Sequence, residues 1–241
     1  MTPDHAESAD ASTDDHFLAP SVRTFPWLQA ALAAVAVFVV EYLLVAALFV
    51  VGPSSVDRNA APINSTVDVL VQYAHILFNA HHVPTITRAT VQIGGSPLAN
   101  DLYIATDASV PPVVFFLIPM VALVVAGGVF EAYRPGNPAE SLLEESALVG
   151  TGFTMGYLLC GVGGALLFVQ RWPLVVQEET IGAASQGPWL WVALVTFFLF
   201  PMVFVTIGAA LYYRKASTAE PPATAVEGES SAAVSADEDQ A

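Results

Sequence analysis

Four long, almost uninterrupted runs of apolar residues are the strongest constraint on what this chain can fold into. The first covers 28–51, and its 24 residues would form a helix of about 36 Å, enough to cross a hydrocarbon core of about 30 Å. The same test predicts further spans at 110–130, 147–169 and 189–213. Because lipid offers no hydrogen bonds to the backbone, such runs are stable there as helices. The sequence therefore predicts a multi-pass integral membrane protein whose first partner is the lipid bilayer.

Composition separates this apolar domain from two acidic tails. The chain is 55% hydrophobic and 12% charged, which is too apolar for an ordinary soluble domain. Of its 22 acidic residues, five lie between Asp4 and Asp15 and six between Glu220 and Asp239. Segments this polar cannot bury enough surface to offset the entropy of ordering. We predict an all-α fold with a four-helix transmembrane domain at 26–215 and disordered acidic tails at 1–25 and 216–241.

Charge also bears on partners and orientation. The net charge of −15 argues against nucleic-acid binding. Four spans place both termini on one side, and the tyrosine and basic pairs at 133–134 and 213–214 directly follow spans. Basic residues that adjoin spans favour the cytoplasmic side. We predict a cell-membrane protein with cytoplasmic termini.

Two of the runs contain an internal repeat. FFLIPMV at 115–121 and FFLFPMV at 197–203 agree at six of seven positions, 82 residues apart. We interpret them as tandem two-helix units in the same orientation, related by a pseudo-twofold axis along the membrane normal; convergent use of apolar residues is the alternative. Pro119 and Pro201 each remove a helix hydrogen bond and predict kinks at equivalent depth.

The third run is rich in glycine. Gly152, Gly156 and Gly163 would let neighbouring backbones approach closely, so this span is expected to be the central packing helix. Cys160 is the only cysteine, which leaves no intrachain disulfide and favours a small packing residue.

A polar stripe lies between the first two spans. Its residues follow steps of four, three, four and three and are Asp68, Gln72, His75, Asn79 and His82. At 100° per residue they fall within an arc of about 80°, which predicts an amphipathic helix at 66–82. At 17 residues it is at the lower limit for a span, so we place it as an interfacial or re-entrant helix on the outer face. A fifth span is the alternative.

The histidines of this segment are candidates for metal or proton chemistry. His75, His81 and His82 carry the side chain that most often ligates metals and titrates near neutral pH. However, His75 and His82 would lie about 10 Å apart on a helix, too far for one ion. We therefore favour a solvated polar face and expect no metal site, no cofactor and no catalytic residues.

Glu41 is the sharpest candidate site because it lies near the middle of the first span. An ionised carboxylate there costs at least about 2.5 kcal/mol, and such residues mark proton or ion paths by default. A parallel third span would place Tyr157 or Thr154 at similar depth as partners. The alternative is an interhelical hydrogen bond worth about 0.6 to 2 kcal/mol. Both interpretations remain open.

The run ILFNAHHV at 76–83, with the proline-bearing second span and glycine-rich third span, resembles a family of uncharacterised membrane proteins from halophilic archaea. The similarity covers 25–213 and implies a multi-pass membrane protein without an assigned activity. We therefore expect a non-enzymatic scaffold or a subunit of a membrane complex, with a second copy of itself or another membrane protein as its partner. The alternatives are a small ion, proton or solute permease or channel that uses Glu41 and the polar stripe, and an intramembrane enzyme that uses the histidines.

Overall fold

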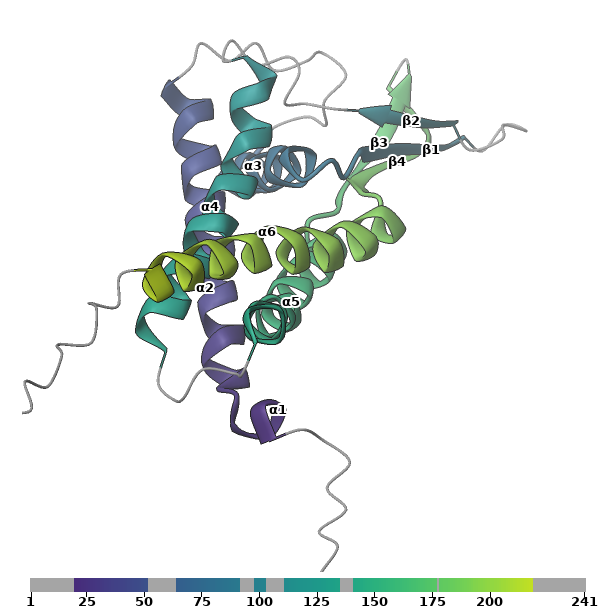
Figure 1. Ribbon diagram of the computed structural model, residues 1–241. Coiled ribbons are helices and arrows are strands. Elements are labelled where there is room, and N and C mark those ends of the chain that lie inside the picture. The colour runs from purple at the N-terminus through teal and green to yellow at the C-terminus, as the bar shows by residue number, and fades with distance from the viewer. Residues whose placement is uncertain are drawn as a thin grey trace, which may run out of the picture.

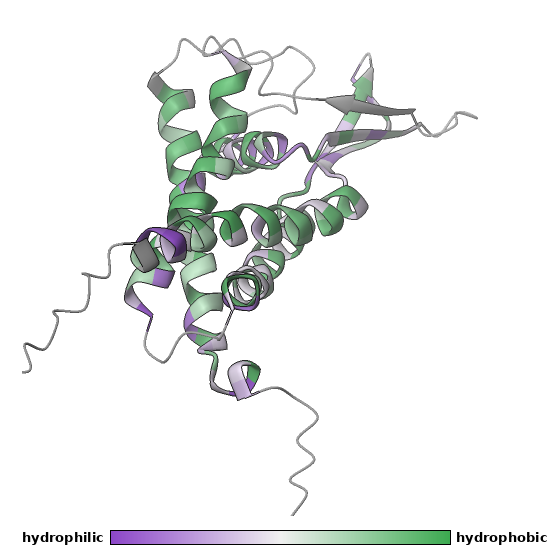
Figure 2. Ribbon diagram, viewed as in Figure 1, coloured by the Kyte–Doolittle hydropathy of each residue, from purple (hydrophilic) through white to green (hydrophobic). Residues whose placement is uncertain are grey.

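Four long apolar helices dominate the computed structural model, which describes residues 20–51, 64–91, 98–102, 111–134, 141–176 and 178–218. They are α2 (Trp27–Val51), α4 (Pro112–Tyr133), α5 (Leu142–Leu167) and α6 (Leu190–Thr218), and a short α1 (Pro20–Thr24) precedes them (Figure 1). All four are long and apolar enough to cross a membrane (Figure 2). The four predicted spans are confirmed, although α5 begins at Leu142 rather than at residue 147. Of the predicted tails, 1–19 and 219–241 lie outside the described residues, whereas 20–24 form α1 and 216–218 belong to α6.

The helices cross one another steeply. In Figure 1, α2 and α4 stand side by side, α6 runs across them and α5 is seen nearly along its axis. Burial recurs every four residues on α4 and α6, at Phe115, Pro119, Leu123 and Gly127 and at Phe197, Pro201, Val205 and Ala209. Ridges with a spacing of four on both helices favour crossing angles near 50°. The four pairs are each 82 residues apart, so the repeated helices bury equivalent faces, which supports a duplication.

Glycines bring the repeated helices into backbone contact. A Cβ on Gly127 of α4 would collide with the carbonyl oxygen of Val205 on α6. A Cβ on Gly208 of α6 would collide with the carbonyl oxygen of Val124 on α4. Small residues at this crossing therefore set the distance between the two helices.

A four-stranded antiparallel sheet is the main departure from the predicted all-α fold. Its strands β1 (Thr85–Val91), β2 (Leu98–Leu102), β3 (Gln170–Val176) and β4 (Glu179–Pro188) lie in the order β2-β1-β4-β3. One hairpin follows α3 in the first connection, and the other connects α5 directly to α6. Each half of the chain thus has a hairpin between its two long helices, and α3 precedes the hairpin in the first half. The sheet lies at one end of the molecule, away from α1 and from the end of α6 (Figure 1).

The amphipathic segment forms α3 (Thr66–Ala80), which ends two residues before the predicted boundary. The Ser65 side chain caps it by accepting a hydrogen bond from the Asp68 backbone N–H. His82 follows the helix with a φ of 60° and therefore lies outside it. With 15 residues α3 is too short for a span, and it packs against α2, α4 and the sheet. Helix α3 is therefore not a fifth span.

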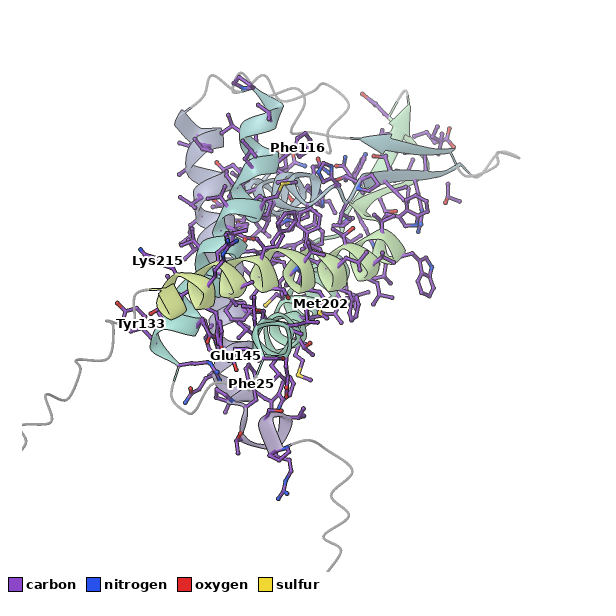
Figure 3. The ribbon with its side chains drawn as sticks, viewed as in Figure 1. Phe25, Phe116, Tyr133, Glu145, Met202 and Lys215 are labelled. Atoms are coloured by element: carbon purple, nitrogen blue, oxygen red, sulfur yellow. The ribbon has the colours of Figure 1, made fainter. Side chains whose placement is uncertain are left out.

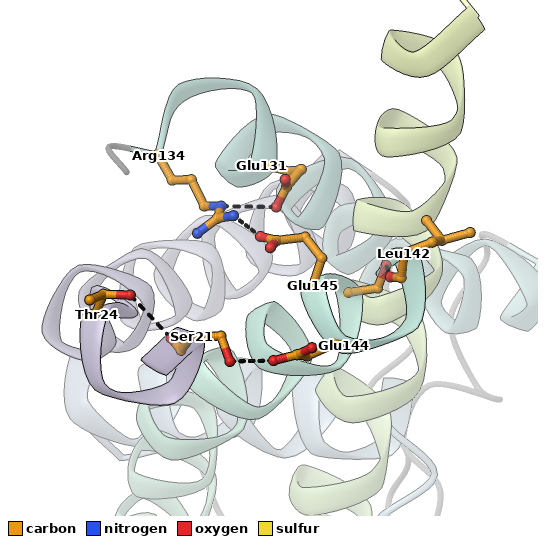
Figure 4. A network of polar contacts seen from close by, with 8 residues as sticks. Ser21, Thr24, Glu131, Arg134, Leu142, Glu144 and Glu145 are labelled. Carbon is orange, nitrogen blue, oxygen red and sulfur yellow. Dashed lines mark hydrogen bonds and ion pairs between the residues drawn. The ribbon is translucent and has the colours of Figure 1, made fainter. Parts of the chain in front are cut away.

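At the opposite end from the sheet, polar contacts connect α1, α4 and α5 (Figure 4). Arg134 forms ion pairs with Glu131, at 3.2 Å, and with Glu145. The Ser21 hydroxyl donates to the Glu144 carboxylate. Glu145 is almost completely buried. Its ion pair with Arg134 therefore holds the end of α4 against the start of α5.

Candidate functional site

A buried cluster of Glu41, Tyr157 and His81 forms the candidate site. Glu41 comes from α2, Tyr157 from α5 and His81 from the turn that ends α3, and all three are fully buried. The Tyr157 hydroxyl donates a hydrogen bond to Glu41 Oε2 and is also hydrogen-bonded to His81 Nε2. His81 Nε2 lies 3.3 Å from the same carboxylate oxygen. The cluster therefore joins two of the long apolar helices and the end of α3 at one point.

Aromatic rings surround this cluster. The ring of Phe38 packs edge-on against Tyr157 at 5.3 Å, and Phe197 lies 4.9 Å from the His81 ring. Phe200 is 5.6 Å from His81 on another side. These apolar rings exclude water and lower the local dielectric constant, which strengthens each hydrogen bond within the cluster.

The hydrogen bonds fix how many protons the cluster holds. His81 Nδ1 lies 2.8 Å from the Leu77 carbonyl oxygen, which only accepts, so Nδ1 carries a proton. If Glu41 is ionised, Tyr157 donates to it and His81 must be an imidazolium that donates from Nε2. If Glu41 is protonated, it donates to Tyr157, which donates to a neutral His81. Both arrangements have zero net charge, so the cluster removes the cost of an isolated buried carboxylate.

One carboxylate oxygen takes no part in these contacts. Glu41 Oε1 is buried and has no hydrogen-bond partner among the described residues. A buried acceptor without a partner costs about 1–3 kcal/mol.

Of the two predicted partners of Glu41, only Tyr157 contacts it. Tyr157 contacts the carboxylate as the depth argument expects. Thr154 does not join the cluster, because its hydroxyl donates to the Gly150 carbonyl of its own helix at 2.8 Å. The prediction did not include His81 as a partner of Glu41. Its position one residue after α3 puts it off the polar stripe, so periodicity gave no signal for the contact.

The polar stripe is not a solvated face, and that prediction is wrong. Gln72, His75 and Asn79 are buried. The His75 Nε2–H donates to the Phe168 carbonyl at 2.8 Å, and the Asn79 amide donates to the Val83 carbonyl at 2.9 Å. These groups satisfy irregular backbone at the ends of α5 and α3, which non-helical segments inside a membrane protein require.

The two ends of the stripe are more accessible than its buried middle, and Asp68 is half-buried. Asp68 accepts a hydrogen bond from the Gln170 amide at 3.1 Å and so ties the start of α3 to β3. His82 is exposed, and its ring stacks on Phe116 of α4 with centroids 4.7 Å apart; Figure 3 labels Phe116 beside α3. Asp68 therefore connects the start of α3 to β3, and His82 connects the turn after α3 to α4.

Two titratable groups of α3 have shifted pKa values. Burial lowers the pKa of His75 to about 4, and its bond to the Phe168 carbonyl opposes this only in part. Hydrogen bonds from Asn64, Gln170 and Ser65 lower the pKa of Asp68. His75 is thus neutral near pH 7. Within the described ranges, no three His, Cys, Asp or Glu side chains gather closely enough to hold a metal ion.

The remaining predicted residues shape the helices around the cluster. Pro119 and Pro201 both lie inside helices. Gly152 and Gly156 of α5 face α2, where a Cβ on Gly156 would collide with the Ala31 carbonyl oxygen. Gly163 was expected on the same packing face, but a Cβ there would meet nothing within 4 Å. The predicted packing role of Gly163 is therefore wrong, because this residue lies on a side of α5 that faces open space.

A family model described as a family of unknown function (DUF7978) matches residues 15–216. The chain belongs to this family. The match covers all four apolar helices, α3 and the sheet, so the buried cluster lies within the family domain. This agrees with the expected uncharacterised family of multi-pass membrane proteins. No curated protein and no solved structure matches the chain.

Proposed function

We propose that the protein is a non-enzymatic scaffold, a subunit that organises a larger membrane complex. The observation that carries this proposal is that Glu41, His75 and Asn79, which are buried in the apolar body, each form a hydrogen bond with another part of the same chain. Glu41 binds Tyr157 and His81, and the stripe of α3 binds the ends of α5 and the sheet. These contacts supply rigidity, which a scaffold requires.

The sheet is the part of the molecule that such a scaffold would present. Because α3 is fixed to β3 and to the turn before β1, the sheet is held in one position relative to the helices. Its outer strands are β2 and β3, and edge strands offer unpaired backbone groups to another chain. A second copy or another membrane protein is the expected partner.

Native mass spectrometry after mild extraction tests this proposal. We expect a defined assembly that contains a second copy or a stoichiometric partner. The Glu41→Gln variant should keep the assembly wherever it keeps its fold, because Glu41 is remote from the sheet edges. A protein that is monomeric and unaccompanied after extraction from its native membrane overturns the scaffold proposal.

A proton permease is the second candidate, and the buried cluster favours it. A carboxyl, a phenol and an imidazole in hydrogen-bond contact can pass a proton between two arrangements of equal charge. His82, beside His81, is exposed, so the imidazole end of the cluster lies one residue from the protein surface. Transport would then use Glu41 as the intramembrane proton site.

Proton flux in proteoliposomes separates the two candidates. If the protein is a permease, flux should exceed that of empty vesicles and fall to that background in Glu41→Gln, while His82→Gln reduces it. The matched control is Gln29→Glu, which changes a polar residue elsewhere on α2. Equal flux in wild type, Glu41→Gln and empty vesicles excludes the permease.

Origin and orientation complete the proposal. The single lysine, Lys215, and the net charge of −15 support a protein that works at high salt, as in halophilic archaea. We place the termini in the cytoplasm on the basic residues beside the spans. Protease treatment of sealed right-side-out vesicles should then leave a C-terminal tag intact. Cleavage of the tag would show that the termini face the outside.

A further inference from the structure

A second site lies where the sheet meets the spanning helices. A cavity of about 330 Å³ opens between one face of the sheet and the junction of α5 with α6. Ile86 and Arg88 of β1 line it from the sheet, together with Ser185, Gly187 and Pro188 of β4. Leu166, Val169, Trp189 and Trp191 line it from the helix ends. The polar side chains of the cavity, Arg88 and Ser185, therefore both come from the sheet, whereas the helix side is apolar.

A second arginine, Arg171, lies beside the cavity on the same face of the sheet as Arg88, and the two form an arginine row across the strands. Arg88 is directly opposite Ser185, and Ser185 is directly opposite Arg171 of β3. Residues that pair directly across antiparallel strands point to the same face and are neighbours at about 5 Å. The two arginines therefore lie on either side of Ser185 on this face of the sheet. Both arginines are exposed, and neither forms an ion pair with any described residue.

The apolar side of the cavity indicates its depth in the membrane. Trp189 and Trp191 are 39% and 70% exposed at the very start of the spanning helix α6. Tryptophans at the ends of spans lie at the level of the lipid headgroups. Leu166, at the end of α5, is also exposed and would face the acyl chains. The arginine row thus lies on the headgroup side of the tryptophans.

We propose that this cavity binds the phosphate group of an anionic membrane lipid. Arginine forms paired, charge-assisted hydrogen bonds with phosphate oxygens, so Arg88 and Arg171 would hold the phosphate between them while Ser185 donates a further hydrogen bond. The indole rings would cover the glycerol region, and one acyl chain would run along Leu166. A free phosphate ion would use the arginines but gain nothing from this apolar wall, so the source is a lipid.

Lipid binding to the purified full-length protein tests this proposal. In detergent, phosphatidylglycerol should raise the thermal midpoint and remain bound in native mass spectra, whereas phosphatidylcholine should do so far less. Arg88→Gln should weaken phosphatidylglycerol binding about tenfold, and the double variant with Arg171→Gln more strongly. Arg88→Lys should lie between wild type and Arg88→Gln, because it keeps the charge and loses the paired geometry.

Arg23→Gln is the matched control, because it removes one exposed charge from α1, at the far end of the molecule. It should bind phosphatidylglycerol like the wild type. Unchanged midpoints without lipid will show that the variants are folded, and Trp191→Ala gives a second test on the apolar side. Equal binding of both lipids overturns the proposal, as does an Arg88→Gln variant that binds like Arg23→Gln. Protection by inorganic phosphate as strong as that by the lipid overturns the lipid as the source.

Discussion

The hydroxyl of Tyr157 on α5 donates a hydrogen bond to the Glu41 carboxylate on α2, across 116 residues of sequence. Both side chains are fully buried. His81 shares the same carboxylate oxygen, so the contact holds α2, α5 and the end of α3 together. A polar contact of this kind in an apolar body stabilises one specific arrangement of helices, because any other arrangement leaves a buried polar group without a partner.

Removing the phenol hydroxyl should therefore destabilise the protein. Tyr157→Phe keeps the ring packing but deprives Glu41 Oε2 and His81 Nε2 of their common partner. We expect a loss of about 1–3 kcal/mol in the free energy of unfolding, seen as a lower thermal midpoint in detergent. Tyr133→Phe is the matched control, because Tyr133 is 84% exposed, and it should leave the midpoint unchanged.

A double-mutant cycle can assign this loss to the pair. The effects of Glu41→Gln and Tyr157→Phe should not add, because the two residues are in direct contact. Additive effects would show that the contact contributes no coupling energy and that the cluster does not fix the helices.

The spans and α3 follow from the sequence because local pattern determines them. Apolar length predicts a span, and the spacing from Asp68 to Asn79 predicts the one polar face of α3. The prediction that this face is solvated was wrong, because the partners of His75 and Asn79 are the backbone carbonyls of Phe168 and Val83. Only the folded chain brings the Phe168 carbonyl to α3.

The sheet shows the same limit. Strand β1 has an alternating pattern with β-branched Thr85, Ile86 and Thr87, which is a usable strand signal. Strand β4 instead contains Gly182, Ala183 and Ala184, which are poor strand formers, and pairing with β1 and β3 overrides that preference. The site is likewise predictable only in part. Depth in the membrane alone suggested Tyr157 as a partner of Glu41, whereas the contact with His81 depends on where α3 ends.

The two glycines Gly156 and Gly163 on α5 should respond oppositely to alanine. A Cβ on Gly156 would collide with the Ala31 carbonyl of α2, so Gly156→Ala should separate α2 from α5 and cost about 1–3 kcal/mol. A Cβ on Gly163 meets nothing within 4 Å, so Gly163→Ala should be neutral or gain up to about 1 kcal/mol from helix propensity. Thermal midpoints of both variants decide this, and equal midpoints would refute the observed α2–α5 crossing.

Arg134 should be essential at the opposite end of the molecule. It pairs with Glu145, which is only 1% exposed, so Arg134→Gln leaves a buried carboxylate without its cation. We expect a loss of about 3 kcal/mol in stability, against almost none for the exposed control Arg23→Gln. Adding Glu145→Gln removes the uncompensated charge and should recover much of the loss. If the double variant is no more stable than Arg134→Gln, the ion pair is not the cause.

His75 should make stability depend on pH in a defined window. Burial lowers its pKa in the folded protein to about 4, whereas an unfolded histidine titrates near 6.5. Unfolding therefore takes up a proton between these values. Stability is complete above pH 6.5, declines as the pH falls, and levels off below about 4, for a total loss of about 3 kcal/mol.

The difference between wild type and His75→Gln isolates this effect, because glutamine can still donate to the Phe168 carbonyl but does not titrate. Between pH 7.5 and pH 4.5, the thermal midpoint of wild type should fall more than that of His75→Gln. His82→Gln is the control, since His82 is exposed, and it should follow the wild type. Asp68 does not interfere, because its pKa is lowered from 3.8 and its contribution is lost only below this window. If wild type and His75→Gln lose stability equally, His75 does not titrate as its burial requires.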